Sequence, residues 1–311
     1  KAINHEIELI NLKKLIVRTF NISETSILSM KLYKKAVDAR KKDQIHLVYS
    51  VDIEVKNEAF ILAKNNRQIS LAPSYKTFDI PFGKRKLVNR PVVIGFGPSG
   101  IFSALLLAKK GYRPIVLERG LDVDQRHEQM DHFLKTLEFT ENASILFGEG
   151  GAGTYSDGKL TTLISDVRCR NVLEELVSHG APEEIMYINK PHVGTDLLRG
   201  VIKNIRQDII KLGGEIRFNA CVTDLVIQNN RLTKVIINHK EELLTNHCLL
   251  GIGHSARDTF QMLYDNHVPL TQKPFAIGVR IEHPQALINQ AQYGAYANHP
   301  SLGAADYKLS Y

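Results

Sequence analysis

The chain has 311 residues, of which 43% are hydrophobic and 23% charged, so it is a folded globular protein of about two domains rather than a disordered chain. No apolar run is long enough to span a bilayer and no secretory signal pattern opens the sequence, so we expect a cytoplasmic protein without a membrane partner. The net charge of +7 includes basic clusters at residues 34–42 and 84–86 without interleaved aromatic residues, which favours a solvated surface over nucleic-acid contact, the alternative.

Residues 1 to about 80 form a block of their own, which we interpret as a small α+β domain. Apolar residues between Ile7 and Val17 indicate an early helix or strand, and His46–Val55 is rich in β-branched residues and predicts a strand. Residues 81–86 are typical of a linker. The N-terminal domain is therefore expected to span residues 1–88.

The segment Pro91–Gly120 carries the strongest pattern in the chain. Val92–Ile94 predicts a short buried strand, and Ile101–Lys110 predicts a helix that Gly111 closes. Pro114–Leu117 predicts a second buried strand. This order is that of a βαβ unit.

The turn between the first strand and the helix has the glycine spacing of a dinucleotide-binding unit. Gly95 permits a tight turn, Gly97 lets a pyrophosphate approach the backbone, and Gly100 allows the helix to pack closely on the strand. Glu118 follows the second strand, 118 − 95 = 23 positions after the first glycine, and can accept hydrogen bonds from ribose hydroxyls. Arg119 could instead favour a 2′-phosphate, but an acid at the strand end favours a free ribose hydroxyl. A turn that binds no phosphate is the alternative.

The regular alternation of strands and helices stops after the second strand. Residues 121–140 are polar with helical periodicity, and a glycine-rich stretch follows at residues 147–160. Two helices are expected near residues 168–179 and 195–212, the second with Thr195 as its candidate N-cap. A plain flexible turn is the alternative for the glycine-rich stretch.

The next part of the chain predicts strands, and the last three of them form an antiparallel meander with turns at Asn229-Asn230 and Asn238. The expected strands are residues 216–218, 221–227, 232–237 and 242–244. Cys248–Ser255 then returns as an apolar strand that ends in glycines, about 130 residues (248 − 118) after the βαβ unit was interrupted. The predicted fold class is α/β: a Rossmann-type parallel sheet with an antiparallel meander insertion, a small N-terminal α+β domain and an incomplete C-terminal domain.

Four strings, FGEGGAGTYSDGKLTT, KPHVGTD, GIGHSARDTF and FAIGVRIEHP, resemble the FAD-dependent, or NAD(FAD)-utilising, dehydrogenases, which have the glutathione-reductase-type FAD-binding fold. The resemblance covers most of the chain, including the small N-terminal domain. It implies an FAD-binding domain with a helical insertion at residues 89–265 and the start of a substrate-binding region at residues 266–311. Such flavoproteins have a further glycine-rich contact with the flavin ring, so we expect this chain to be a fragment with an incomplete ring site.

The resemblance also implies the residues that contact FAD. The first turn would hold the pyrophosphate; Glu118 would bind the adenosine ribose, with Arg119 beside the adenine end and Arg126 within reach of a phosphate or ribose. The glycine-rich stretch would pass along the pyrophosphate, ribityl chain and flavin, and the backbone of Val222 would bind adenine. The full set is Gly95, Gly97, Pro98, Ser99 and Gly100; Glu118, Arg119 and Arg126; Gly150, Gly151, Ala152, Gly153, Ser156, Gly158, Lys159 and Leu160; Val222; and Gly251, Gly253, His254 and Ser255. A cap or a solvated side chain is the alternative for His254.

We therefore expect a FAD-dependent oxidoreductase, a dehydrogenase or reductase that transfers hydride through the flavin N5 to or from an unidentified small-molecule substrate, with NAD(P)H as a candidate electron donor. The alternatives are a flavin-dependent RNA-modifying enzyme and a non-enzymatic FAD-binding redox sensor. No catalytic acid or base stands out by spacing, and no metal-ligand spacing occurs. Cys169, Cys221 and Cys248 form no CxxC, so disulfide chemistry is not expected.

Overall fold

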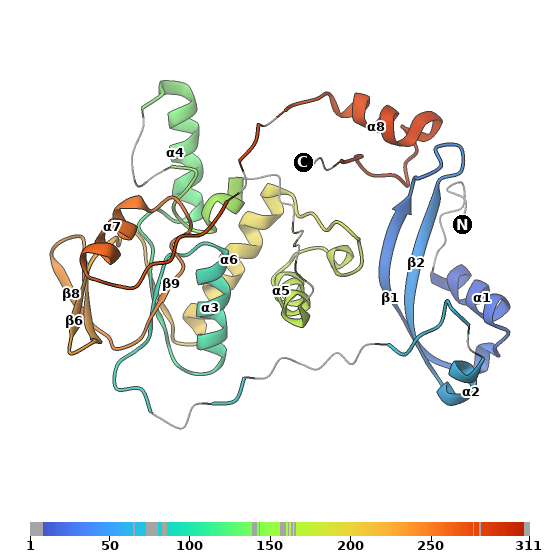
Figure 1. The fold of residues 1–311 in the computed structure, drawn as a ribbon, viewed down its shortest axis with the longest axis horizontal. Helices are drawn as coiled ribbons and strands as arrows, with labels where there is room; N and C mark the ends of the chain where they lie inside the picture. The colour runs from blue at the N-terminus through green and yellow to red at the C-terminus, as the bar shows by residue number, and fades with distance from the viewer. Residues whose placement is uncertain are drawn as a thin grey trace. The chain divides into compact units, whose positions relative to one another are not determined.

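The structure of the protein is a computed structural model, in which the chain divides into two compact units (Figure 1). The first unit comprises Lys1–Lys76, Met186–Pro191 and Pro274–Tyr311, and the second comprises Thr77–Ile185 and His192–Lys273. The residues that the structure describes are 9–64, 66–72, 80–82, 86–138, 142, 144–155, 160, 162, 164, 166–275, 277–279 and 281–307. Within these residues, no helix combines the length and the apolar character needed to cross a bilayer.

The second unit is built on a four-stranded parallel sheet with the strand order β5-β4-β3-β9 (Figure 1). Its strands are β3 (Val92–Ile94), β4 (Ile115–Leu117), β5 (Glu215–Arg217) and β9 (Cys248–Leu250). Val92 lies opposite Ile115 on one side and Cys248 on the other. The chain therefore returns to the sheet beside β3 after a long insertion, with β9 as an edge strand, and the predicted Rossmann-type α/β fold is confirmed.

Helices cover one face of this sheet. They are α3 (Pro98–Lys109), α5 (Val167–Ser178) and α6 (Thr195–Lys211). Ile101 and Leu105 of α3 and Ile205 and Ile209 of α6 are buried in one cluster with Val93 of the sheet. Burial of these apolar side chains stabilises the layer, because the sheet strands are too short to hold together by their hydrogen bonds alone.

The ends of two helices differ in part from the prediction. Gly97 is the N-cap of α3 and Pro98 its first residue, so the helix starts earlier than predicted; the fixed φ of proline suits a first turn. The predicted cap of α6 at Thr195 is wrong, because Gly194 has the extended backbone of the N-cap and Thr195 is already helical. Gly111 follows the last turn of α3 with φ +76°, as predicted for a glycine that closes a helix.

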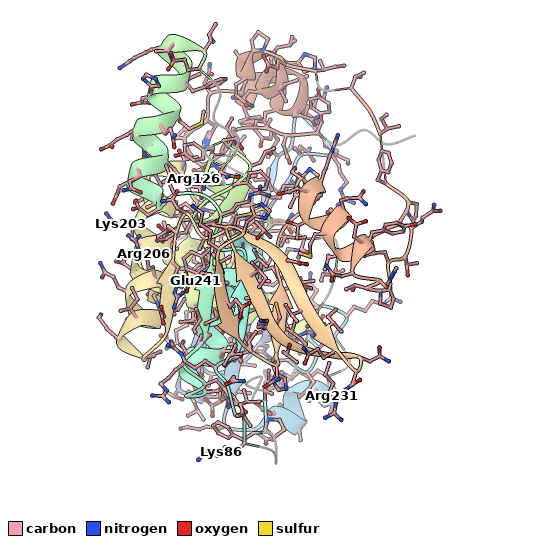
Figure 2. All side chains as sticks on the ribbon, turned by 90° about the vertical axis from the view of Figure 1, so that its left-hand side faces the viewer. Lys86, Arg126, Lys203, Arg206, Arg231 and Glu241 are labelled. Atoms are coloured by element: carbon pink, nitrogen blue, oxygen red, sulfur yellow. The ribbon has the colours of Figure 1, made fainter. Side chains whose placement is uncertain are left out.

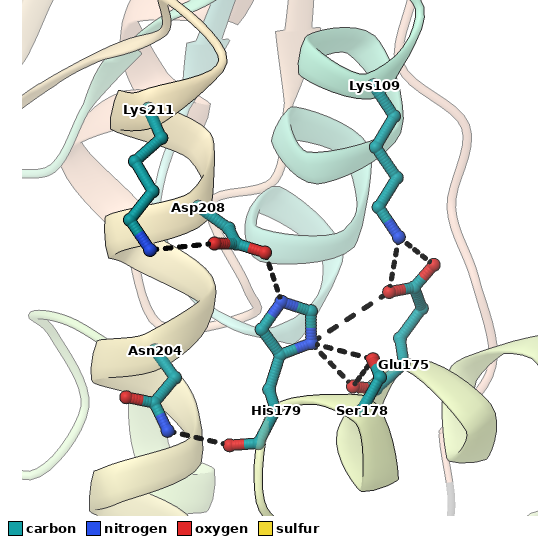
Figure 3. Close-up of polar contacts among 7 residues, drawn as sticks. All are labelled: Lys109, Glu175, Ser178, His179, Asn204, Asp208 and Lys211. Carbon is teal, nitrogen blue, oxygen red and sulfur yellow. Dashed lines mark hydrogen bonds and ion pairs between the residues drawn. The ribbon is translucent and has the colours of Figure 1, made fainter.

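A polar network ties α5 to its two neighbours (Figure 3). His179 caps the C-terminus of α5; its Nδ1 lies 2.6 Å from the carbonyl oxygen of Glu175, and its Nε2 lies 3.2 Å from Asp208 of α6. Lys109 of α3 donates to the Glu175 carboxylate at 2.7 Å, and Asn204 of α6 donates to the His179 carbonyl at 2.8 Å. Both ring nitrogens of this buried histidine face acceptors, so the ring acts as a structural link between helices.

An antiparallel meander and one helix cover the other face of the sheet. The elements of this layer are β6 (Val222–Gln228), β7 (Arg231–Ile237), β8 (Glu241–Leu244) and α7 (Arg257–Asp265). The three strands pair in sequence order, as predicted. Both hairpin turns, at Asn229-Asn230 and Asn238-His239, have positive φ at both residues, which matches the twist of tight hairpins. Leu225, Val235 and Leu263 are buried against the sheet.

The first unit contains a long β-hairpin with helices packed on it. Its elements are α1 (Leu9–Phe20), η1 (Glu24–Ser26), β1 (Ile27–Asp38), β2 (His46–Val55), α2 (Glu58–Ala63), α8 (Gln285–Tyr293) and η4 (Gly294–Tyr296). Leu12, Ile16 and Ile61 are buried in a cluster with the hairpin, while Ile45 packs with Tyr293 in a second cluster. The β2 strand and the mixed helix-and-strand character of this block agree with the sequence prediction.

The remaining elements of the chain are α4 (Val123–Thr136), η2 (Gly151–Tyr155) and η3 (Glu183–Met186). Asp122 is the N-cap of α4, and its carboxylate accepts hydrogen bonds from the backbone N–H groups of Asp124 and Gln125. The helix predicted for residues 121–140 is thus present and well capped, and its first turn lies next to the candidate site.

Candidate functional site

A cavity of about 720 Å³ opens in the second unit at the carboxyl ends of β3, β4 and β9. Its volume is in the range of small-molecule and cofactor sites, and open α/β sheets bind their ligands at this edge. The cavity brings together most of the residues predicted to contact a cofactor. Those that line it are Gly95, Gly97, Pro98, Ser99, Glu118, Arg119, Gly151, Ala152, Gly153, Val222, Gly251, Gly253, His254 and Ser255.

Other predicted contacts are placed differently. Gly100, Arg126, Gly150 and Leu160 do not line the cavity, although the structure describes all four. Ser156, Gly158 and Lys159 lie outside the described residues, so their predicted roles stay predictions.

The glycines of the first turn are required for different reasons. A Cβ on Gly95, which has φ +91°, would lie 2.5 Å from the carbonyl oxygen of Gly251, and a Cβ on Gly100 would lie 1.9 Å from the carbonyl oxygen of Gly95. These two glycines let β3, α3 and the loop after β9 meet. A Cβ on Gly97 would have only the Cα of Gly151 within contact, at an ordinary 3.8 Å. Protein packing therefore requires Gly95 and Gly100, whereas Gly97 leaves space that opens into the cavity.

Glu118 joins three backbone segments at the edge of the cavity. Its carboxylate accepts hydrogen bonds from the N–H groups of Phe96 at 2.6 Å and of Gly120 and Gly148 at 2.8 Å each, and the residue is only 4% exposed. The sequence predicts that this acid accepts hydrogen bonds from ribose hydroxyls. In the structure it also holds three backbone segments together. A ribose hydroxyl can still bind, because each carboxylate oxygen has two acceptor positions and Oε2 uses only one of them.

Arg126 binds the backbone of the second glycine-rich loop, residues 145–151, which overlaps the start of the glycine-rich stretch. Its guanidinium donates to the carbonyl oxygens of Ile145 and Gly151 at 3.0 Å and to that of Glu149, and it stacks on the ring of Tyr155 at 4.8 Å. Burial lowers the pKa of this guanidinium, in spite of the acidic groups near it. In the structure these contacts fix the loop backbone, and the predicted contact of Arg126 with a phosphate or ribose stays a prediction.

Glu149 is a buried charge that the sequence did not single out. Its carboxylate accepts a hydrogen bond from the N–H of Val123 at 2.9 Å and lies 3.2 Å from Arg206 of α6, which Figure 2 shows together with Arg126 of α4. Burial raises the pKa of this carboxyl, and its Oε1 has no hydrogen-bond partner among the described residues. The only signal in the sequence is that Glu149 is the one charged residue near the start of the glycine-rich stretch.

Arg119 lines the cavity next to Glu118. Its two terminal nitrogens donate to the carboxylate of Asp258 at 2.8 Å each, its Nε donates to Asn142 at 3.0 Å, and its guanidinium lies over the ring of Phe147 at 4.4 Å. Asp258 lies in the first turn of α7 and was not predicted as a site residue. The hydrogen bond from Arg119 lowers the pKa of Asp258, outweighing the effect of burial.

The rest of the cavity wall is mainly apolar. The lining residues that the sequence did not identify are Ile94, Leu117, Leu146, Phe147, Gly148, Ala220, Cys221, Leu250, Ile252, Ala256, Thr259, Phe260, Leu263, Val268, Pro269 and Leu270. Nothing but their hydrophobic character marks most of them in the sequence. A cavity with apolar walls and a few convergent polar groups suits an organic ligand with a flat ring.

The described residues contain no group of three or more His, Cys, Asp or Glu side chains arranged to hold a metal ion. The three cysteines are free thiols. Burial raises the pKa of Cys248, in β9, to about 12, so this thiol stays protonated at neutral pH.

The parallel sheet, the glycine-rich turn and the acid at the end of β4 define an α/β fold of the Rossmann type. Residues 274–311 match the family model described as FAD-dependent protein, C-terminal domain-like. Residues 3–54 match a family model described only as a domain of unknown function. The resemblance to FAD-dependent proteins is therefore confirmed.

An uncharacterized protein of Clostridium beijerinckii is 48% identical to this chain over 301 residues, which are 96% of the chain and 56% of the relative. The chain thus spans little more than half the length of that relative. Among solved structures, THI4 of Thermovibrio ammonificans aligns with 58% of this chain and 64% of its own, at 18% identity and a TM-score of 0.36. Glycine oxidase of Bacillus cereus aligns with 58% and 60%, at 14% identity and a TM-score of 0.37. These two likenesses are too distant to carry an activity over to this protein.

Proposed function

We propose that the cavity of the second unit binds FAD and that the protein is a FAD-dependent oxidoreductase. The observation that carries the proposal is Gly97, which lines the cavity and has room for a Cβ on the protein side. A glycine that packing does not require fits a backbone that a ligand approaches closely. The match of residues 274–311 to FAD-dependent proteins supports FAD as that ligand.

The residues at the cavity fit the adenosine diphosphate part of FAD. Ser99 and the N-terminus of α3 offer backbone N–H groups and the positive end of a helix dipole to the pyrophosphate. Glu118 has an acceptor position left for a ribose hydroxyl. Val222, at the start of β6, lines the wall where the adenine would lie.

Bound FAD would supply the redox chemistry, which is hydride transfer. The chain's own residues would bind and orient the cofactor, and the apolar wall would exclude water from it. In this proposal, residues 1–88, 89–265 and 266–311 are the N-terminal, FAD-binding and substrate-binding parts. The substrate is a small molecule, and NAD(P)H is the proposed electron donor.

The proposal is tested by the cofactor content of the purified protein. We expect a yellow protein that releases one equivalent of FAD on denaturation, identified by chromatography against FAD, FMN and NAD standards. Anaerobic mixing with NADH and NADPH then shows whether either donor bleaches the flavin absorbance. A colourless protein that neither contains nor takes up FAD, or one that releases NAD, would refute the assignment.

A further inference from the structure

We propose that Asp258 is a specificity-determining residue: it occupies Arg119 and so restricts the cavity to adenine nucleotides whose ribose 2′-hydroxyl is free. This inference rests on the proposed nucleotide site. It concerns which nucleotides that site rejects, and it assigns a role to a residue of α7 that the βαβ pattern does not include.

Arg119 is the residue best placed to attract a 2′-phosphate. It follows directly after Glu118 at the end of β4, where the ribose of a bound dinucleotide lies in this fold, and both residues line the cavity. A guanidinium binds phosphate with two parallel hydrogen bonds, and an arginine at this position is the usual means of accommodating a 2′-phosphate. An unengaged Arg119 would therefore favour phosphorylated nucleotides.

In the structure, Arg119 already donates its hydrogen bonds to other side chains. Both terminal nitrogens donate to the two oxygens of Asp258 at 2.8 Å, which is the two-pronged geometry that a phosphate would need. Asn142 accepts from Nε at 3.0 Å, and the ring of Phe147 supports the guanidinium plane at 4.4 Å. The arginine side chain is 12% exposed, so a turn toward a phosphate would break all of these contacts in a confined space.

The formal charge at this end of the cavity also disfavours a 2′-phosphate. Two carboxylates, Glu118 and Asp258, and one guanidinium, Arg119, give a formal charge of −2 + 1 = −1 at this end of the cavity. A 2′-phosphate would bring about two more negative charges next to a carboxylate that is 4% exposed. Free ribose hydroxyls, in contrast, can donate to Glu118. FAD fits this requirement because its adenosine ribose carries no 2′-phosphate.

The test compares two small probes by calorimetry, 5′-AMP and adenosine 2′,5′-bisphosphate, which differ only in the 2′-phosphate. The parent protein should bind 5′-AMP about tenfold or more tightly than the bisphosphate, the difference expected for charged hydrogen bonds that are not made. Asp258→Asn keeps the side-chain shape but removes the charge, and it should reduce this preference at least severalfold by strengthening bisphosphate binding. Adding Arg119→Met to that variant should restore the preference. Asp265→Asn, at the far end of α7, is the matched control and should change nothing.

The inference is overturned if the parent binds 5′-AMP but Asp258→Asn leaves the preference unchanged. If Asp258→Asn alone does not fold, the double variant Arg119→Met/Asp258→Asn decides, because it keeps the formal charge of the parent site. An arginine already held by Asp258 should leave the preference as it is in the parent, whereas selective loss of bisphosphate binding in the double variant contradicts the proposal. A parent protein that binds neither probe refutes the nucleotide site itself, and with it this inference.

Discussion

At the scale of single residues, Glu118 has a structural role that the sequence pattern did not suggest. The acid at the end of β4 was expected to receive ribose hydroxyls. In the structure, its carboxylate also accepts three backbone N–H groups, from the first turn, from the residues just after β4 and from the second glycine-rich loop. If the cavity binds FAD as proposed, binding of the ribose and alignment of the loops would be coupled through this one side chain.

Glu118→Ala should accordingly weaken both the site and the fold. Loss of the ribose contact should lower FAD affinity about ten- to a hundredfold, as expected for charged hydrogen bonds. Buried N–H groups left without an acceptor should also lower the free energy of unfolding by about 1–3 kcal/mol or more, which the sequence alone did not predict. Calorimetry and urea unfolding measure the two effects. Unchanged FAD affinity in a destabilised variant would leave Glu118 with a structural role alone.

At the scale of elements, Arg126 binds the backbone of the loop at residues 145–151. Arg126 of α4 does not line the cavity, but its guanidinium donates to three loop carbonyl oxygens. One of them belongs to Gly151, which does line the cavity. We therefore expect Arg126 to act as a positioning residue for the loop.

Arg126→Met should release the loop. Three carbonyl oxygens lose their charged donor, so we expect faster backbone hydrogen exchange at residues 145–151 in the absence of any ligand, together with weaker FAD binding. Lys135→Met, at the exposed end of the same helix, is the control. If FAD affinity falls while exchange in the loop stays at the parent rate, Arg126 contacts the ligand directly and the positioning role is wrong.

Glu149 should make the stability of this region depend on pH. Burial raises the pKa of Glu149 above its ordinary value of 4.5, so ionisation is unfavourable in the folded state. Its contribution to stability is fully present below pH 4.5 and is lost as the pH rises through the raised pKa. Glu149→Gln, which cannot ionise, should therefore gain stability relative to the parent as the pH rises. Urea unfolding of both proteins from pH 4.5 to pH 8 measures this difference; a relative loss for the variant would mean that pairing with Arg206 outweighs burial.

The sequence predicted the elements whose pattern is local. The short buried strands β3 and β4 and the helix between them follow from apolar runs and glycine punctuation, and the meander follows from its asparagine turns. The strand β1 was missed because its lysines alternate with apolar residues and were interpreted as part of a basic cluster. The helices α7 and α8 were missed because each has only nine residues and no side-chain N-cap.

Site residues, too, were predictable from the sequence only where their pattern is local or where the family resemblance implies them. Gly95 and Gly97 were predictable from their spacing, whereas Gly151, Gly153, Gly251 and Gly253 were implied by the family resemblance. Asp258 and Glu149 were not predictable, because their roles depend on partners distant in the sequence: Asp258 reaches Arg119 across 139 positions, and Glu149 reaches Val123 across 26. The contact of Arg126 with a phosphate or ribose stays a prediction; its hydrogen bonds to the loop carbonyl oxygens could not be predicted, because they too join residues distant in the sequence.

At the scale of the whole molecule, the chain is organised as two units that interleave in sequence. The N-terminal hairpin shares a unit with residues 274–311, and Ile45 of the hairpin end is buried with Tyr293 and Leu302. The candidate cofactor cavity is formed entirely by the other unit. Residues 274–311, which match FAD-dependent proteins by sequence, belong to the first unit, whereas the residues that line the cavity belong to the second.

The central claim, that the cavity beside Gly97 holds FAD, is tested most directly by FAD binding to the parent, to Gly97→Val and to Gly200→Ala. A Cβ on Gly97 meets only an ordinary contact within the protein, so Gly97→Val should fold with a melting temperature close to that of the parent while its side chain fills the space meant for the pyrophosphate. Gly200, on α6 outside the cavity, has open space around it and is the matched control. We predict stoichiometric FAD in the parent and in Gly200→Ala and none in a folded Gly97→Val. Stoichiometric FAD in folded Gly97→Val would contradict the account.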